Sequence, residues 1–407
     1  MIFSSYQLKH KILADRYNSI IFKKGRGKDI YLVGGYIRDI LRGVRSPDRD
    51  YIVRGDLIPF VEAIRDMIGG TIVTFKNTNM VRIVLKNGLT FDFSTSAGTL
   101  EEDLSKRDFT INAIAWSPER EMIDTYNGLE DIKNKKIRSV FEKNLISDPL
   151  RMVRAYRFAA ELNGSIAKST RNTIKMYHSK VKAVSSERIT LELFNLLNSD
   201  HSSKYLKMAL SDNLLRSILL ISNNMLERNI KGISLLEKGT ISALSSTIKV
   251  ILNKIVSQNL TYKGLLCLEL LLQNRFAIPQ WNPNIKVSNV IRKRLELAQK
   301  GIKVLKDRRC KVKDELFDIF MRLKEAVKDV LIITNRLDLF KDYKRFQRIW
   351  KKGFLSSEAI ITISGIETGP ALGIIITELK KAQFYGRIPS KISAVNFIKN
   401  IRLKFLK

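Results

Sequence analysis

The sequence predicts an α/β head with a small mixed β-sheet, followed by an all-α remainder. Up to about residue 140, short apolar runs typical of strands alternate with short amphipathic helices. Beyond that point, almost every segment has the apolar spacing of a helix. Charge divides the chain similarly, because residues 201–407 carry +23 of the formal net charge of +32 and residues 1–200 carry +9. A run of strands followed by a run of helices indicates two architectures in one chain.

The first expected strand, Tyr31–Val33, leads into Gly34 and Gly35, and a short amphipathic helix follows. Two glycines between a strand and a helix allow close approach of a ligand to the backbone and leave N–H groups for an anion. Arg38 lies on the helix away from its apolar face. Gly34, Gly35 and Arg38 therefore form a candidate phosphate-binding turn.

Asp48 and Asp50 lie one residue apart at the start of the next expected strand, "DRDYIV". Alternate residues of a strand face the same side, so both carboxylates point into one small volume. This arrangement suits a Mg²⁺ ion held against phosphates at the glycine turn. The sequence "PDRD" is also typical of a turn in which Asp bonds to nearby backbone, so a structural role is the alternative.

The segment "VRIVLKNGLTFDFS" predicts a β-hairpin with its turn at Asn87-Gly88. Asp92 lies between two phenylalanines in the second strand. A carboxylate flanked by inward-packing apolar residues needs a partner, which makes Asp92 the third candidate. The alternative is an aspartate that faces water on an edge strand. Thr99 and Glu102 then have the spacing of a capping box, so a helix should start directly after the hairpin.

The segment "SDPLRMVRAYRFAAEL" predicts a helix from about residue 148 to 163, with Ser147 as N-cap and Pro149 in its first turn. Three-residue steps place four charged residues along one slowly rotating face: Asp148, Arg151, Arg154 and Arg157. The three arginines repel one another, and a phosphate or a polar base edge would relieve this. The alternative partners are Glu101, Glu102 and Glu161.

Asp148 and Arg151 can imitate a Watson–Crick partner. The carboxylate accepts from the exocyclic amine of cytosine or adenine, and the guanidinium donates to the neighbouring ring acceptor. Uracil and guanine present the reverse pattern. This pair would therefore favour cytosine and adenine over uracil and guanine.

Five ordered segments resemble the motifs of class II tRNA nucleotidyltransferases, a family that contains CCA-adding, CC-adding and A-adding enzymes and bacterial poly(A) polymerases. The similarity covers residues 30–200 nearly without gaps. The segments are "LVGGYIRDILRG…DRDYIV", "KRDFTINAIAW" (106–116), "DTYNGLEDIKNKKIRSV" (124–140), "SDPLRMVRAYRFAAEL" (147–162) and "SSERITLELFNLL" (185–197).

The resemblance implies nucleotidyl transfer from an NTP to a 3′-hydroxyl by a two-metal-ion mechanism that releases pyrophosphate. Asp48 and Asp50 would be the metal ligands, with Mg²⁺ as cofactor, and Asp92 the third catalytic carboxylate. By similarity, Arg107 contacts the nucleotide, and Asp108 and Asn112 lie near its ribose. The expected partners are the acceptor arm of tRNA at its 3′ end and CTP, with ATP as the alternative nucleotide.

The chain departs from the family pattern at two places. Ser147 stands where the family has an acidic residue, which leaves the preference between C and A open. Only "FSTSAGT", residues 93–99, separates Asp92 from the next helix, where CCA-adding members have a long flexible loop. By similarity that loop lets the pocket switch from C to A, and chains without it are CC-adding enzymes.

We therefore expect an enzyme that adds two cytidines and stops, with a separate A-adding enzyme as a further partner. The enzymatic alternatives are a full CCA-adding enzyme, an A-adding enzyme and a poly(A) polymerase. The alternative of a different class is an RNA-binding protein that keeps the head as a catalytically inactive scaffold.

The expected organisation is a lead-in at 1–28, a nucleotidyltransferase head at 29–145, a nucleotide-recognition neck at 146–200, a helical body at 201–280 and a helical tRNA-binding tail at 281–407. Residues 291–313 and 341–352 interleave basic side chains with helical apolar spacing. Each would pack one face on a core and offer the other to phosphates, gripping RNA by shape and backbone.

The remaining features predict a cytoplasmic protein without a membrane partner. The lead-in is polar and lysine-rich, so no signal peptide is expected. The longest apolar run, "GLLCLELLL", is interrupted by Glu269 and too short to span a bilayer. Cys267, Cys310 and three scattered histidines provide neither zinc spacing nor a disulfide framework, which fits a reducing compartment.

Overall fold

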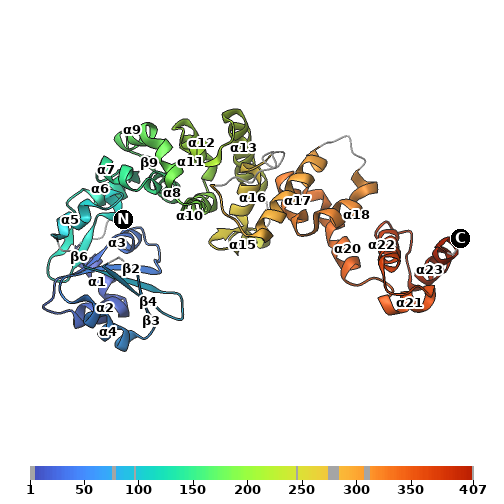
Figure 1. Cartoon of the computed structure of the whole chain (residues 1–407), viewed down its shortest axis with the longest axis horizontal. Coiled ribbons are helices and arrows are strands. Elements are labelled where there is room, and N and C mark those ends of the chain that lie inside the picture. The colour runs from blue at the N-terminus through green and yellow to red at the C-terminus, as the bar shows by residue number, and fades with distance from the viewer. Residues whose placement is uncertain are drawn as a thin grey trace. The chain divides into compact units, whose positions relative to one another are not determined.

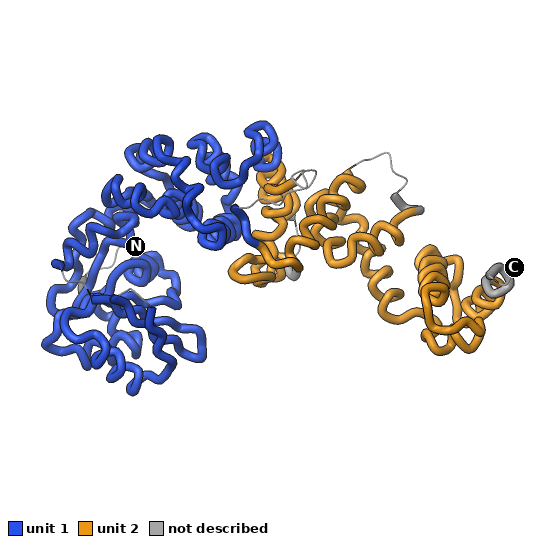
Figure 2. Tube along the Cα trace, in the orientation of Figure 1, with its two compact units in different colours: residues 1–230, 282–286 blue, residues 231–281, 287–407 orange. Residues whose placement is uncertain are grey.

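The computed structural model describes residues 5–75, 79–95, 98–243, 246–273, 284–306 and 312–405. The chain divides into two compact units (Figure 2): residues 1–230 with 282–286, and residues 231–281 with 287–407. The first unit contains an α/β head and a series of helices, and the second is almost entirely helical. The predicted fold class is confirmed. Cys310 lies outside the described residues.

The head is built on one seven-stranded sheet with the strand order β3-β4-β5-β2-β1-β6-β7 (Figure 1). β2 and β5 run parallel and the other neighbours antiparallel, so the sheet is mixed, as predicted. The strands are β1 (Ile30–Val33), β2 (Asp48–Val53), β3 (Thr71–Thr74), β4 (Met80–Val84), β5 (Thr90–Ser94), β6 (Ala115–Ser117) and β7 (Glu121–Ile123).

Four helices contribute buried residues to the core on one face of this sheet: α1 (Ser5–Ala14), α2 (Arg16–Lys24), α3 (Gly35–Leu41) and α4 (Leu57–Ile68). Tyr51, Phe91 and Phe93 are fully buried there. α1 and α2 lie within the segment predicted as a polar lead-in, yet Leu8 and Ile12 are as buried as the sheet side chains. Their apolar residues are spaced as one helical face, and we therefore include residues 5–24 in the head.

The opposite face of the sheet is only partly covered. α5 (Leu100–Ser105) packs Leu100 and Leu104 onto a cluster that includes Val33 and Ile52. The predicted capping box of α5 is present, since the Thr99 side chain accepts from the Glu102 N–H and Glu102 accepts from the Thr99 N–H. The short segment before α5 therefore ends in a fixed helix start close to β5.

The first unit contains further helices, one of them within the head and the others after it. They are α6 (Gly128–Lys133) in the head, then α7 (Glu142–Ser147), α8 (Leu150–Leu162), α9 (Lys168–Tyr177), η2 (His178–Ala183), α10 (Ser186–Asn198), α11 (Ser202–Ser211), α12 (Leu214–Leu219) and the start of α13 (Asn223–Leu235). The 3₁₀ turn η1 (Thr110–Asn112) and the short parallel pair β8 (Lys136–Ile137) and β9 (Ser165–Ile166) complete this unit.

The predicted N-cap at Ser147 is wrong. Ser147 is the last residue of α7, and its hydroxyl donates to the carbonyl of Asn144 at 3.3 Å. Asp148 is extended, and α8 begins only at Leu150. The residue before a proline is disfavoured in helical conformation, so Pro149 separates two helices where one was expected to start.

The second unit packs around two further hydrophobic clusters, one built by α17–α20 with Phe384 and one by α21–α23. Its elements are η3 (Leu236–Thr240), α14 (Ile241–Ala243), α15 (Ser246–Leu252), β10 (Ile255–Ser257), β11 (Leu260–Thr261), α16 (Tyr262–Leu271), α17 (Asn289–Lys306), α18 (Val312–Leu323), η5 (Lys324–Ala326), α19 (Val327–Ile333), η6 (Leu337–Leu339), α20 (Phe340–Lys351), α21 (Ser357–Ser364), α22 (Pro370–Phe384) and α23 (Lys391–Phe405). Among the described helices, none combines the length and apolar character that a membrane span requires.

Candidate active site

Three carboxylates converge on the partly covered face of the head sheet. In the parallel pair β2–β5, Asp50 lies opposite Asp92, and Asp48 lies two residues before Asp50 on the same face of β2. β5 lies between β2 and β4, so Asp92 is not on an edge strand and that alternative is excluded. The predicted trio is therefore brought together by sheet register.

The three carboxylates lie close enough for their negative charges to affect one another. Burial raises the pKa of Asp50 to about 6, Asp92 and Asp48 add to the rise, and Arg107 opposes it. Asp92 is held by the guanidinium of Arg82 through two bonds of 2.5 and 2.6 Å. Asp48 is exposed and accepts from the hydroxyl of Thr90. Asp50 is thus the carboxylate of the three that most needs a neighbouring cation.

Arg82 is a site residue that the sequence reasoning missed. In the antiparallel pair β4–β5 it lies directly opposite Asp92. The observed loop has three residues, 86–88, because Leu85 N–H donates to the Leu89 carbonyl and Gly88 has φ +82°. The hairpin was predicted correctly, but a two-residue turn at Asn87-Gly88 would have placed Phe93 opposite Arg82.

The glycine turn lies against Asp50. Gly34 has φ +76° and ψ −137°, a conformation that essentially only glycine adopts. A Cβ at Gly34 would lie 3.2 Å from Asp50 Oδ2 and 3.5 Å from Arg107 Nη1. Gly34 therefore lets the turn, a carboxylate and an arginine share one small volume.

The turn differs from the prediction in one respect. The Gly34 N–H donates to the Ile114 carbonyl at 3.2 Å, so this N–H is used within the head. The guanidinium of Arg38 lies over Gly35, at 3.4 Å from the position of an added Cβ. An anion at this turn would therefore contact the backbone N–H groups of Gly35 and the residues after it.

Arg107 comes to this site from the end of α5. Its guanidinium donates to Asp103 at 3.0 Å, and its side chain is only partly buried. Of the arginines predicted to bind nucleotide, it is the one that the structure places beside both Gly34 and Asp50. A positive group in this position suits the negative oxygens of a triphosphate.

Four of the predicted nucleotide-binding residues lie in one largely buried series of hydrogen bonds. Arg38 donates to Asn112 Oδ1 at 2.7 Å, and Asn112 donates to Asp108 Oδ1 at 2.9 Å. Arg154 Nε donates to the other Asp108 oxygen at 2.9 Å. Burial raises the pKa of Asp108, but Arg154 and Asn112 outweigh burial and leave this pKa below its ordinary value. These hydrogen bonds connect α3, which begins at the glycine turn, with α8.

Glu192 neutralises the arginines of α8 and was missed from the sequence. It pairs with Arg154 at 3.0 Å and with Arg157 at 2.6 Å. Arg157 also pairs with Glu161 at 2.7 Å, one of the alternative partners expected. The sequence did contain an indication of this role, because Glu192 is an acidic residue among the apolar positions of "SSERITLELFNLL". In the structure it lies on the buried side of α10. The repulsion predicted among the arginines is thus relieved by the protein itself.

Asp148 and Arg151 form a separate, partly exposed pair. Arg151 Nε lies 3.9 Å from Asp148 Oδ2, and Arg151 Nη1 donates to the Lys106 carbonyl, next to Arg107, at 2.8 Å. Arg188, which the sequence reasoning did not single out, binds Asp148 at 2.9 Å. The pair expected to read the base therefore lies close to the chain segment that carries Arg107.

The carboxylate trio offers oxygen ligands of the kind that divalent cations bind. Among the described residues, no group of three or more His, Cys, Asp and Glu side chains has the arrangement of a complete metal site. Mg²⁺ in phosphoryl-transfer sites is usually bound by one or two carboxylates together with substrate phosphates and water. Asp48 and Asp50 supply such oxygen ligands, and the raised pKa of Asp50 marks a place where a cation would relieve charge. The residues fit the ion.

Comparison with known proteins gives two family matches. Residues 30–138 match the poly A polymerase head domain, and residues 165–224 match the probable RNA and SrmB-binding site of polymerase A. The first match contains the carboxylate trio and the glycine turn. The second covers the helices from α9 to the start of α13.

Curated relatives with three different activities are similar to this chain. A CC-adding tRNA nucleotidyltransferase of Synechocystis is 37% identical over 189 residues, which are 45% of this chain and 45% of the relative. An A-adding enzyme of Deinococcus radiodurans is 35% identical over 42% of this chain and 41% of its own length. A CCA-adding enzyme of Leuconostoc mesenteroides is 32% identical over 46% of this chain and 50% of its own length. The matched region is about half of each relative or less.

The whole fold is similar to a solved structure. The Thermotoga maritima CCA-adding enzyme, complexed with tRNA, superposes with a TM-score of 0.75 over 100% of this chain and 99% of that one, at 18% identity. This match shows the fold. The two family matches and the curated relatives show that the N-terminal part of the chain is similar to poly A polymerases and to tRNA nucleotidyltransferases.

Proposed function

We propose that this protein adds cytidines to the 3′ end of tRNA, taking them from CTP and releasing pyrophosphate, and that it stops after two. The observation that carries the transferase part is the convergence of Asp48, Asp50 and Asp92 beside Gly34 and Arg107. Sequence similarity to enzymes that perform such additions supports the choice of reaction.

In this proposal the 3′-hydroxyl of the RNA attacks the α-phosphorus of CTP, a new P–O bond forms, and the bond to the β-phosphate breaks. Gly34 and Gly35 keep the turn open to the triphosphate, and Arg107 stabilises its negative charge. Mg²⁺ bound by Asp48 and Asp50 would supply positive charge at the phosphates and lower the pKa of the attacking hydroxyl. Asp92 is the third carboxylate, adjacent to Asp50 across the strands.

The base is read by Asp148 and Arg151, which are both partly exposed. Arg38, Asn112, Asp108 and Arg154 support this pair indirectly, because their hydrogen bonds connect α3 with α8. Arg157 supports it from α8 by its ion pair with Glu192 on α10. The nucleotide therefore has its phosphates at α3 and its base near the start of α8. Cytosine and adenine both fit this donor and acceptor pattern.

The restriction to cytidine rests on the short segment 93–99. It passes from β5 into α5, whose first turn is fixed by the capping box at Thr99 and Glu102. Little chain is left here to form the long flexible loop of CCA-adding enzymes. Because A-adding and CCA-adding enzymes are also similar to this chain, addition of adenosine is the alternative.

The substitution Asp48→Asn tests the reaction. It removes one proposed metal ligand at an exposed position, so the fold should be kept. We expect labelled CMP incorporation into a tRNA that lacks its 3′ CCA to fall at least a thousandfold, on the order of what loss of an essential catalytic group costs. RNA binding, measured by fluorescence anisotropy, should be unchanged. Unchanged incorporation would contradict the role of Asp48 as a metal ligand, and an absence of incorporation by the unmodified protein would support the scaffold alternative.

A further inference from the structure

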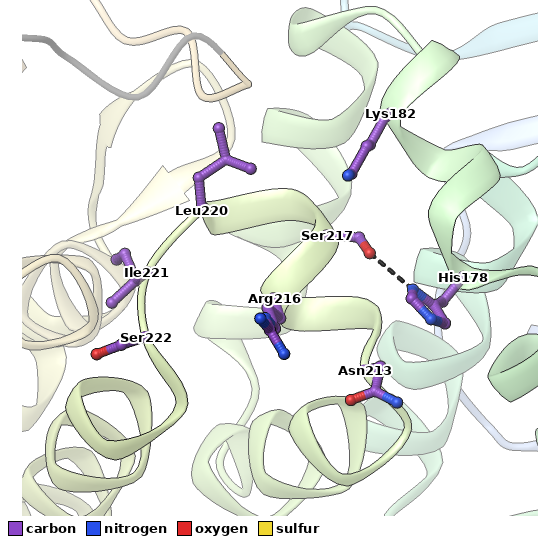
Figure 3. A pocket seen from close by; sticks show the side chains of 8 residues that line it. All are labelled: His178, Lys182, Asn213, Arg216, Ser217, Leu220, Ile221 and Ser222. Carbon is purple, nitrogen blue, oxygen red and sulfur yellow. Dashed lines mark hydrogen bonds between the residues drawn. The ribbon is translucent and has the colours of Figure 1, made fainter.

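The N-terminal segment packs behind the candidate active site. Residues 5–24, which contain α1 and α2, lie outside both family matches, at 30–138 and 165–224. A pocket of about 610 Å³ between η2 and α12 (Figure 3), by contrast, lies inside the second match and so in the region that resembles an RNA-binding site. The buried polar groups of α2 therefore have no role that either family match assigns.

Asn18 is the central residue of this segment. It is fully buried, and both polar atoms of its side chain are hydrogen-bonded. The side-chain nitrogen donates to the Ile12 carbonyl at 3.0 Å and to the Tyr36 hydroxyl at 3.1 Å, and the side-chain oxygen accepts from the Tyr51 hydroxyl. One side chain thus connects α1, α3 and β2.

The two tyrosines come directly after residues of the candidate site. Tyr36 follows the glycine turn at the start of α3, and Tyr51 follows Asp50 in β2. Because alternate residues of a strand face opposite sides, Tyr51 points into the core while Asp50 points to the partly covered face of the sheet. Asn18 therefore holds both the glycine turn and the strand of the carboxylates from the buried side.

Arg49 makes a second connection on the buried side of β2. Its guanidinium donates to Asp15 at 2.5 Å, and the Asp15 carboxylate also caps α2 by accepting from two N–H groups of the first turn, at 3.0 Å each. The guanidinium carbon of Arg49 lies 4.8 Å from the centre of the Tyr36 ring. Both residues that flank Asp50 in β2 are thus fixed by the start of α2.

The spacing of the site leaves little room for movement of the turn. Pairing of β1 with β2 brings the end of β1 opposite Asp50, and a Cβ on Gly34 would lie 3.2 Å from Asp50 Oδ2. Strand register does not determine the direction in which α3 leaves the sheet, because this helix begins beyond the paired residues. The hydrogen bonds of Tyr36 and Arg38 supply that constraint.

We propose that Asn18 is a positioning residue for nucleotidyl transfer, which fixes the glycine turn, through Tyr36, relative to the strand of Asp50, through Tyr51. The proposal rests on the function above, since it gives these residues a part in that reaction. Burial raises the pKa of both tyrosines, so their hydroxyls stay protonated at neutral pH and Tyr51 remains a donor to Asn18. A displacement of about 1 Å can reduce a rate about a hundredfold, so a connection of this kind affects catalysis without touching the substrate.

The test removes one hydroxyl at a time. Tyr36→Phe breaks the connection to α3, Tyr51→Phe breaks the connection to β2, and each keeps its ring in the core. Tyr205→Phe is the matched control, since Tyr205 in α11 is fully buried and donates its hydroxyl to the Gly164 carbonyl at 2.8 Å, outside the head. Initial rates of CMP incorporation into a tRNA transcript without its 3′ CCA give kcat and the KM for CTP, and thermal denaturation gives the midpoint of each variant.

We expect Tyr51→Phe to lower kcat about tenfold with little change in the KM for CTP, because it loosens the strand that carries Asp50. Tyr36→Phe should raise the KM for CTP about fivefold, because it loosens the turn at the triphosphate. The control should keep both constants, although its thermal midpoint falls as much as theirs. Kinetic constants of the two variants that equal those of the control would show that Asn18 contributes to stability alone, and the proposal would be overturned.

Binding of CTP separates a failure of this proposal from a failure of the proposed function. The Kd of CTP in the presence of Mg²⁺, measured by isothermal titration calorimetry, does not require transfer. If the unmodified protein transfers no nucleotide but Tyr36→Phe binds CTP more weakly than the control, the positioning of the turn stands and the proposed reaction fails. If the unmodified protein transfers cytidine and neither tyrosine variant differs from the control, the reaction stands and the positioning role fails.

Discussion

Glu192 is the residue on which the arrangement of α8 most depends, because it holds both Arg154 and Arg157. Glu192→Gln keeps the shape but removes the charge, which leaves two partly buried arginines short of a partner. We expect the free energy of unfolding to fall by about 3 kcal/mol, as for other broken buried ion pairs, measured by urea denaturation.

Glu187→Gln on the same helix is the matched control. Its pair with Lys286 is exposed on both sides, so it should change stability little. Equal effects of the two substitutions would mean that Glu192 does not organise the arginines. The KM for CTP should rise with Glu192→Gln and stay constant with Glu187→Gln, because only the former displaces residues behind the base-reading pair.

Asp212 gives a prediction of pH dependence. Burial raises its pKa, but the hydrogen bonds from Arg171 and Tyr156 outweigh burial and leave the pKa below its ordinary value. The stabilisation is therefore complete above the unfolded pKa, about 3.9, and is lost as the pH falls through the folded value. Asp212→Asn should lower the free energy of unfolding by about 3 kcal/mol at neutral pH.

This deficit of Asp212→Asn should shrink as the pH falls below about 4, because Asp212 of the unmodified protein is protonated in the unfolded chain before it is protonated in the folded protein. Urea denaturation at several pH values measures it. A deficit that stays constant down to pH 3, which is about one unit below the unfolded pKa, would show that the charge of Asp212 contributes nothing.

At the scale of the residue, the sequence predicted which carboxylates meet but not what balances them. Asp48 and Asp50 follow from strand alternation, whereas the place of Asp92 beside them depends on the register of β2 and β5. Arg82 could not be assigned, because a turn one residue shorter turns it away from Asp92. Glu192 and Arg188 come from α10, and their partners are 35–45 residues away in sequence, a distance that periodicity does not bridge.

At the scale of the element, the turn between β1 and α3 has the strictest requirement. Gly34→Ala introduces a Cβ at a positive φ, 3.2 Å from Asp50 Oδ2. We expect it to cost about 2 kcal/mol in stability and to reduce kcat/KM for CTP more strongly than stability alone explains. Thermal denaturation and initial rates at limiting CTP measure the two effects.

Gly373→Ala is the control for the glycine turn. Gly373 lies inside α22 with nothing within 4 Å of an added Cβ, so alanine should stabilise the helix by about 0.5–1 kcal/mol and leave the rates unchanged. If Gly34→Ala behaves as mildly as this control, the close approach at the turn is not needed for the reaction.

Helix boundaries were the least predictable elements. Pro370 opens α22, in the first turn where a proline is tolerated. Pro149 was expected inside a helix that starts at Ser147, but it separates α7 from α8 instead. The difference is physical: a proline tolerates the first turn of a helix and disfavours helical conformation in the residue before it. The sequence alone did not show that α7 already occupied residues up to Ser147.

At the scale of the whole molecule, the change from strands to helices was predictable because the period of the apolar residues changes along the chain. The role of residues 5–24 was not, since the lysines of α1 and α2 conceal a face that is buried against the sheet. These segments are polar in composition, and their apolar face can be recognised only once the residues are arranged in a helix.

The distribution of charge predicts how RNA binding depends on salt. Residues 201–407 carry +23 of the net charge. If they contact about six phosphates, the affinity for tRNA should fall roughly a thousandfold between about 50 and 200 mM salt, because each contact releases counterions. The KM for CTP should vary far less, since few charges face the nucleotide. A tRNA affinity as insensitive to salt as the KM for CTP would contradict binding by these basic residues.

The central claim is that this protein adds two cytidines to tRNA and stops. Extension of a tRNA transcript without its 3′ CCA, and of the same transcript ending in CC, measures it most directly when each is resolved at one nucleotide with CTP, ATP or both. We expect two cytidines on the first RNA and no adenosine on the second. Addition of adenosine to the CC end would contradict the specificity derived from residues 93–99, and long adenosine tails on either RNA would indicate a poly(A) polymerase.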